Sequence, residues 1–97
     1  MERYDIAIIG TGPAGLEAAV TAKIRNKNIL LFGNKSLSNK IEKAHTIKNY
    51  LGLPEISGED LQNSFKKHLD QMKIEITEDK VNAVYSMGNY FAIQGHG

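Results

Sequence analysis

The sequence predicts an α/β fold, in which a strand–helix–strand unit with parallel strands precedes a second helix and an antiparallel β-hairpin. Apolar runs at residues 6–9 and 29–32 have the length of buried strands, and residues 14–25 between them carry apolar side chains at helical spacing. A helical crossover of this kind makes the two strands parallel. Near the end of the chain, Gly88-Asn89 separates two short strand-like runs, as a two-residue hairpin turn does.

We expect one domain over residues 1–97, with the strand–helix–strand unit at 4–32, an irregular loop at 33–57, a helix at 58–72 and a strand with the hairpin at 73–94. The first strand is apolar on both alternations, which predicts that both of its faces are covered. Asn26 is placed to end the first helix in the left-handed conformation. Ser57 is placed to cap the second helix, whose core stripe is Leu61, Phe65, Leu69 and Met72.

The composition excludes several classes of protein. The chain has 97 residues, 41% hydrophobic and 24% charged, and a net charge of +1, which gives no indication of a nucleic-acid partner. It has no cysteine, so it carries neither a disulfide scaffold nor a thiolate zinc site. Its apolar runs are too short for a membrane span or a secretion signal, and we therefore expect a cytoplasmic protein without membrane contact. The spacing of the histidines and carboxylates predicts no metal site.

A glycine-rich motif, Gly10-Thr11-Gly12-Pro13-Ala14-Gly15, lies between the first strand and the first helix. In this setting Gly10 permits the turn out of the strand, Gly12 leaves room for a pyrophosphate, and Gly15 lets the helix pack closely on the strand. The start of the helix then offers unpaired backbone N–H groups to the phosphates. Pro13 has no backbone N–H, but an N–H at the first helical position would have no partner within the helix. We therefore predict a Rossmann-like nucleotide site that includes Gly10, Gly12, Pro13, Ala14 and Gly15.

The second half of the dinucleotide fingerprint is missing. An acidic residue is expected at the end of the second strand, where it binds the ribose hydroxyls. This chain has Gly33-Asn34-Lys35 there, and the next acid in the sequence is Glu42. Either backbone groups at Gly33 and the Asn34 side chain hold the ribose, or the nucleotide is bound in a different way. Lys35 suits a 2′-phosphate, although a lysine at a loop tip is more often simply solvated.

The motifs together resemble those of the flavoprotein disulfide reductases, and within them the thioredoxin reductase group. Tyr4-Asp5 before the strand and Gly-x-Gly-Pro-Ala-Gly after it are similar to the opening of these enzymes, and residues 47–52 with residues 56–61 resemble their Asn-aromatic-x-Gly and Ile-x-Gly-x-x-Leu segments. The sequence has Ser36-Leu37-Ser38-Asn39 where thioredoxin reductases carry Gly-Gly-Gln-Leu. This departure and the missing acid are more like the ferredoxin-dependent flavin thioredoxin reductases.

The resemblance implies an N-terminal part of an FAD-binding domain, with FAD as the cofactor and residues 33–57 as a cofactor loop. It implies that Asn49 lies near the flavin, although a turn asparagine bonding its own backbone is an equal alternative, and that Gly33, Asn34 and Val81 also contact the cofactor. The parent enzyme is expected to be an oxidoreductase acting on disulfides, with NADPH or ferredoxin as electron donor and a thioredoxin-like acceptor. The chain lacks the redox-active cysteine pair of that group. An open hairpin edge also allows a homodimer.

Two alternatives to this interpretation remain open. The chain is a non-enzymatic module that binds an adenine nucleotide through the glycine motif, or it is an inactive fragment that folds only with a partner or a second copy. Bound flavin favours the first interpretation, colourless protein that binds ADP favours the module, and concentration-dependent folding without a ligand favours the fragment.

Overall fold

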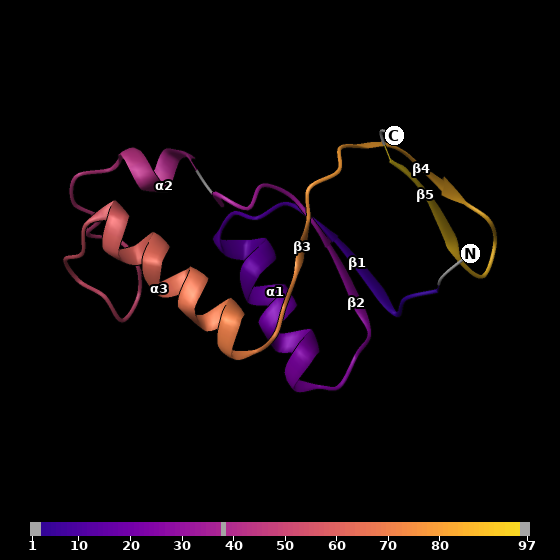
Figure 1. Cartoon of the computed structure of the whole chain (residues 1–97), viewed down its shortest axis with the longest axis horizontal. Coiled ribbons are helices and arrows are strands. Elements are labelled where there is room, and N and C mark those ends of the chain that lie inside the picture. Colours follow the sequence, from indigo (N-terminus) through magenta and orange to yellow (C-terminus); the bar gives the residue numbers. More distant parts are fainter. Residues whose placement is uncertain (1–2, 38, 96–97) are drawn as a thin grey trace.

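The computed structural model describes residues 3–37 and 39–95, and Figure 1 shows its arrangement. The elements follow the predicted order, with one additional short helix. They are β1 (Ile6–Ile9), α1 (Pro13–Ile24), β2 (Ile29–Phe32), α2 (Asn39–Lys43), α3 (Gly58–Gln71), β3 (Ile76–Thr77), β4 (Val81–Ser86) and β5 (Phe91–Gly95). In the described part of the chain, no helix is both long and apolar enough to cross a membrane.

The first sheet contains β1, β2 and β3 in that order, and all three strands are parallel. The pairs Ile9↔Phe32 and Phe32↔Thr77 are in register, so the carboxyl ends of the three strands meet at one edge. The predicted strand–helix–strand unit and its parallel strands are therefore confirmed. This edge matters for function because ligands of open α/β sheets bind outside the carboxyl ends of the strands.

The core lies between α1, the inner face of the sheet and α3. The predicted stripe of α3 is confirmed, since Leu61 and Leu69 are buried and Phe65 and Met72 pack against the core. Both predicted helix ends are confirmed as well: Asn26 adopts φ +59°, and the Ser57 Oγ accepts the amide of Asp60 at 3.0 Å. The buried core residues are Leu16, Ala19, Val20, Leu31, Leu37, Leu69 and Ile74.

The prediction that both faces of the first strand are covered is wrong. Ile8 is half-buried against the core, but Ile6 is 40% exposed and Ile9 is 58% exposed. The physical reason is that α1 covers only one face, while β1 lies at an edge of the sheet and pairs only with β2 among the described residues. Apolar side chains on both faces of a strand show that both faces can be buried. They do not show that another element of the described chain covers each face.

Residues 33–57 are more regular than predicted. The structure forms α2 there and joins the flanks of the following loop by antiparallel bridges between Ile47 and Ile56 and between Tyr50 and Leu53. Gly58 packs so closely on α2 that a Cβ would overlap the carbonyl oxygens of Ile41 and Ala44. A helix of five residues has little intrinsic stability, so this contact with α3 explains it better than local sequence does.

The predicted hairpin is confirmed in β4 and β5. The Met87 N–H donates to the carbonyl of Tyr90 at 2.8 Å, and Gly88 has φ +92°, as the two-residue turn requires. Figure 1 shows the hairpin on the side of the sheet away from α1 and α3. Its apolar side chains are poorly covered, with Val84 50% and Phe91 70% exposed.

Candidate functional site

The glycine turn joins β1 to α1 at the carboxyl edge of the sheet, and two of its glycines are required by the fold itself. Gly10 has φ +124°, a conformation that side chains rarely adopt, and its N–H donates to the Phe32 carbonyl at 2.8 Å. At Gly15 a Cβ would overlap the carbonyl oxygen of Gly10. Gly15 therefore permits the close packing of helix on strand that the motif predicts.

Gly12 is different, because nothing among the described residues requires a glycine there. It is the N-cap of α1 with φ −75° and ψ 177°, which any residue adopts, and a Cβ built on it meets no atom within 4 Å. A glycine with ordinary backbone angles and open space before it is what a bound group in close approach to the backbone would need. The residues present therefore fit a pyrophosphate at this position.

The first turn of α1 is suited to an anion. Pro13 is the first helical residue, and the Leu16 N–H is the one that donates to the Gly12 carbonyl, at 3.1 Å. The amides of Ala14 and Gly15 precede it and have no acceptor within the helix. The first turn contains no acidic residue that would repel a phosphate. The glycine turn thus places the amides of Ala14 and Gly15 beside the open space at Gly12.

The loop after β2 lies beside this turn and is held by contacts from three other elements. The Gly33 N–H donates to the Thr77 carbonyl at 3.2 Å, and the Asn34 N–H donates to the Thr11 Oγ1 at 3.1 Å. Gln62 of α3 donates a side-chain N–H to the Ser36 carbonyl. Gly33 is needed because a Cβ there would overlap the Thr11 side chain. The structure therefore brings Gly33 and Asn34 to the glycine turn.

Two residues of this site were not predicted from the sequence. Thr11 is only 6% exposed, and its Oγ1 both accepts the Asn34 N–H and donates to the Leu37 carbonyl at 3.4 Å. Glu78 follows β3, and its Oε2 accepts the Lys35 N–H at 3.0 Å. The sequence signal that would have found Glu78 is its position directly after a parallel strand, since the carboxyl ends of such strands share one edge.

The remaining predicted residues lie farther along the fold. Asn49 is exposed in the bridged loop, and the ring of its neighbour Tyr50 packs against Phe65 in a tilted arrangement, with ring centroids 5.8 Å apart. Tyr50 and Pro13 line one small cavity of about 120 Å³, so this loop approaches the start of α1. Val81 is half-buried, begins β4 and pairs with Gly95.

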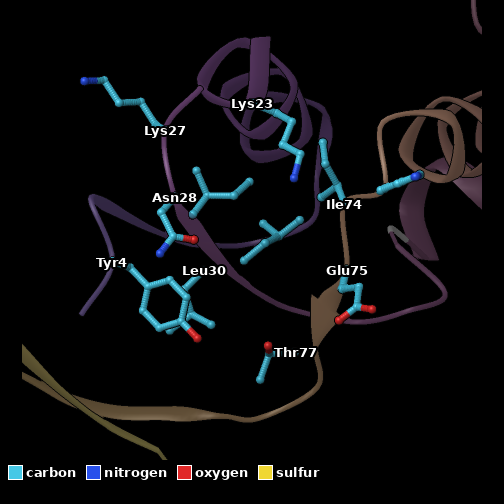
Figure 2. Close-up of a pocket in the computed structure, with 11 residues that line it drawn as sticks. Tyr4, Lys23, Lys27, Asn28, Leu30, Ile74, Glu75 and Thr77 are labelled. Carbon is cyan, nitrogen blue, oxygen red and sulfur yellow. The ribbon is translucent and has the colours of Figure 1, made fainter. Parts of the chain in front are cut away.

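A larger cavity of about 240 Å³ lies elsewhere, between the amino-terminal ends of β2 and β3 and the last turn of α1 (Figure 2). Its polar lining includes Tyr4, Lys23, Asn28 and Glu75, and none of the predicted cofactor residues lines it. Figure 2 shows that Lys27 points away from it. The cavity lies at the amino ends of the strands, away from the glycine turn at their carboxyl ends. The glycine turn, and not this cavity, is therefore the candidate functional site.

Among the described residues, the groups that the glycine turn offers to a ligand are backbone amides rather than reactive side chains. The donors that face the site are backbone amides, which bind phosphates without reacting. Within residues 3–37 and 39–95, no group of three or more histidines or carboxylates is placed to hold a metal ion. The chemistry of a bound cofactor would therefore come from the cofactor, and these residues would position it.

Residues 4–94 match the family model described as pyridine nucleotide-disulphide oxidoreductase. The chain belongs to this family. The thioredoxin reductase of Ureaplasma parvum is 31% identical over 93 residues, and that of Peptoclostridium litorale is 39% identical over 80 residues. A solved structure, a ferredoxin-flavin thioredoxin reductase from Clostridium acetobutylicum, is 59% identical with a TM-score of 0.94.

The matches cover most of this chain and a minor part of each of these members of the pyridine nucleotide-disulphide oxidoreductase family. They cover 96% of this chain and 30% of the Ureaplasma enzyme, 80% and 25% for the Peptoclostridium enzyme, and 98% and 33% for the Clostridium structure. The predicted family resemblance and the predicted fold class are both confirmed.

Proposed function

We propose that this chain forms the part of an FAD site that binds the adenosine diphosphate half of the cofactor, in an oxidoreductase similar to thioredoxin reductase. One observation supports the proposal most directly: Gly12 has ordinary backbone angles and open space at its Cβ position, at the start of α1, where the first amides have no acceptor within the helix. Gly10, Pro13, Ala14 and Gly15 complete the phosphate surface, and Gly33 and Asn34 border the ribose. Asn49 and Val81 are proposed contacts toward the remainder of the cofactor.

For a whole enzyme of the relatives' length, we propose disulfide reduction with a thioredoxin-like acceptor. FAD, when bound, supplies the electron transfer. The cysteine pair expected of such enzymes is not among these 97 residues, so this chain contributes binding and orientation. We propose ferredoxin rather than NADPH as the electron donor, because the ferredoxin-flavin thioredoxin reductase structure is 59% identical while a thioredoxin reductase structure from Lactococcus lactis is 28% identical.

A calorimetric titration of the chain with ADP and with FAD tests this proposal. The glycine turn holds the diphosphate, so the two ligands should bind with affinities within about one order of magnitude, or roughly 1.4 kcal/mol. Binding of FAD several orders of magnitude tighter than ADP would contradict the assignment to the adenosine diphosphate half. Binding of neither ligand, with folding that depends on protein concentration, would favour the inactive fragment.

A further inference from the structure

The loop after β2 lacks the acid of the dinucleotide fingerprint, but the neighbouring strand brings a carboxylate to the same place. β2 ends at Phe32, which is in register with Thr77 at the end of β3. The Gly33 N–H donates to the Thr77 carbonyl at 3.2 Å, so the segments that follow β2 and β3 leave the sheet side by side. The next residue after Thr77 is Glu78, which therefore starts from the carboxyl edge of the sheet beside Gly33.

The Glu78 side chain lies on the loop that follows β2 and does not extend away from it. Its Oε2 accepts the Lys35 N–H at 3.0 Å, and the residue is exposed. The loop beneath it is fixed to the glycine turn, because the Asn34 N–H donates to the Thr11 Oγ1 at 3.1 Å and Thr11 is 6% exposed. Through Thr11, the position of the carboxylate is set relative to Gly12, where the pyrophosphate would lie.

The chemistry of a carboxylate suits a ribose. An ionised carboxylate has two oxygens that only accept hydrogen bonds, and a ribose offers two adjacent hydroxyl donors. Hydrogen bonds to a charged acceptor are roughly twice as strong as those between neutral groups. The Lys35 amide holds one oxygen of the Glu78 carboxylate and so fixes the orientation of the carboxylate. An aspartate or glutamate at the end of β2 would be fixed by its own strand instead. The same negative charge disfavours a 2′-phosphate on the ligand.

We propose that Glu78 supplies, from β3, the ribose-binding carboxylate that is missing from the end of β2. This inference rests on the proposed function, since it assumes that a nucleotide occupies the glycine turn. The site should therefore select nucleotides whose ribose hydroxyls are free. Lys35 contributes through its backbone N–H, which holds Glu78, and not through a side-chain contact with a 2′-phosphate.

The test compares ADP with 2′,3′-dideoxy-ADP by calorimetric titration of the 97-residue chain. Wild type should bind ADP at least about tenfold more tightly than the dideoxy nucleotide, because charge-assisted hydrogen bonds to the hydroxyls are lost. Glu78→Ala should weaken ADP binding and leave dideoxy binding less changed, so that the ratio of the two affinities falls toward one. Glu75→Ala is the matched control, since Glu75 is an exposed acid on the same segment at the other end of the strand, and it should keep the wild-type ratio.

A purely structural role for Glu78 gives a different result. If Glu78 only anchors Lys35, Glu78→Ala lowers both affinities equally and the ratio stays at its wild-type value, which overturns the proposal. Glu78→Gln keeps an oxygen for the Lys35 amide, so the hydrogen-exchange rate of that amide should stay at its wild-type value while the affinity ratio still falls. An unchanged affinity ratio in Glu78→Gln counts against the carboxylate. Equal binding of ADP and the dideoxy nucleotide by wild type refutes the role of Glu78 but retains the proposed function. Failure of wild type to bind either nucleotide refutes both.

Discussion

Two alanine substitutions three residues apart should differ in their effects: Gly12→Ala should weaken nucleotide binding with little change in stability, whereas Gly15→Ala should lower stability. The structure gives the reason. The backbone of Gly12 has φ −75° and ψ 177°, and a Cβ there meets nothing within 4 Å. A Cβ at Gly15 would overlap the backbone carbonyl of Gly10, which cannot rotate away as a side chain would.

The expected magnitudes follow from these environments. At Gly12, alanine should gain about 0.4–1 kcal/mol from the lower entropy of the unfolded chain. It should lose a similar amount, roughly 0.5–1 kcal/mol, as a poorer N-cap. The free energy of unfolding should thus change by no more than about 0.5 kcal/mol, or about 4 °C in Tm. At Gly15, helix propensity favours alanine by about 1 kcal/mol, but pushing α1 off β1 costs about 2–3 kcal/mol, the upper part of the usual range for overpacking, because the overlap is with a backbone atom. We expect a net loss of about 1–2 kcal/mol and a Tm lower by roughly 4–16 °C.

Thermal unfolding followed by circular dichroism measures the stabilities, and calorimetric titration with ADP measures binding. Gly12→Ala should unfold near the wild-type temperature and bind ADP more weakly. Gly12→Val should stay folded and lose at least about tenfold in ADP affinity, because its larger side chain fills the space left for the pyrophosphate. If Gly12→Ala destabilises the chain as much as Gly15→Ala does, then the fold requires Gly12 and the ligand argument fails. Wild-type ADP affinity in folded Gly12→Val would also refute it.

Two further results follow from the same geometry. Thr11→Val should lower the free energy of unfolding, measured with denaturant, by about 1–3 kcal/mol, because the amide of Asn34 loses its buried acceptor. Thr11→Ser keeps the hydroxyl and should keep most of the stability. Equal losses in both variants would show that the methyl group matters rather than the hydroxyl. The chain alone should not reduce thioredoxin with excess FAD and reduced ferredoxin or NADPH, because it has no cysteine to supply a thiolate. Thioredoxin thiols formed above the free-flavin background in proportion to the chain's concentration would contradict this.

The parts of the fold that the sequence predicted well are those specified by neighbouring residues. The β1–α1–β2 unit, the hairpin turn at Gly88 and the left-handed Asn26 follow from local periodicity and turn chemistry. The two tyrosines beside the hairpin turn, Tyr85 and Tyr90, do not face each other across the strands: Tyr85 lies opposite Ala92, and the Tyr90 ring packs under the Arg3 guanidinium, 4.6 Å from the ring centroid. The two-residue turn brings Met87 against Tyr90, and this register places Tyr85 opposite Ala92.

The missed features depend on contacts between residues distant in the sequence. The short helix α2 is held by α3, and the exposure of β1 depends on what lies opposite it, so neither follows from the local pattern. In the candidate site, the glycine motif predicted the phosphate surface from a contiguous stretch. The contacts of Thr11 with Asn34 and of Glu78 with Lys35 join residues 23 and 43 positions apart, and only the sheet topology brings them together.

The central claim is that a nucleotide binds where the glycine turn meets the end of β2. Backbone amide chemical shifts recorded during titration of the chain with ADP test this claim most directly. We predict that the largest saturable changes occur at Gly12, Ala14, Gly15 and Asn34, with small changes at Lys23 and Asn28 around the cavity at the opposite end of the sheet. Saturable changes centred on Lys23 and Asn28, or no saturable change at the glycine turn, would contradict it.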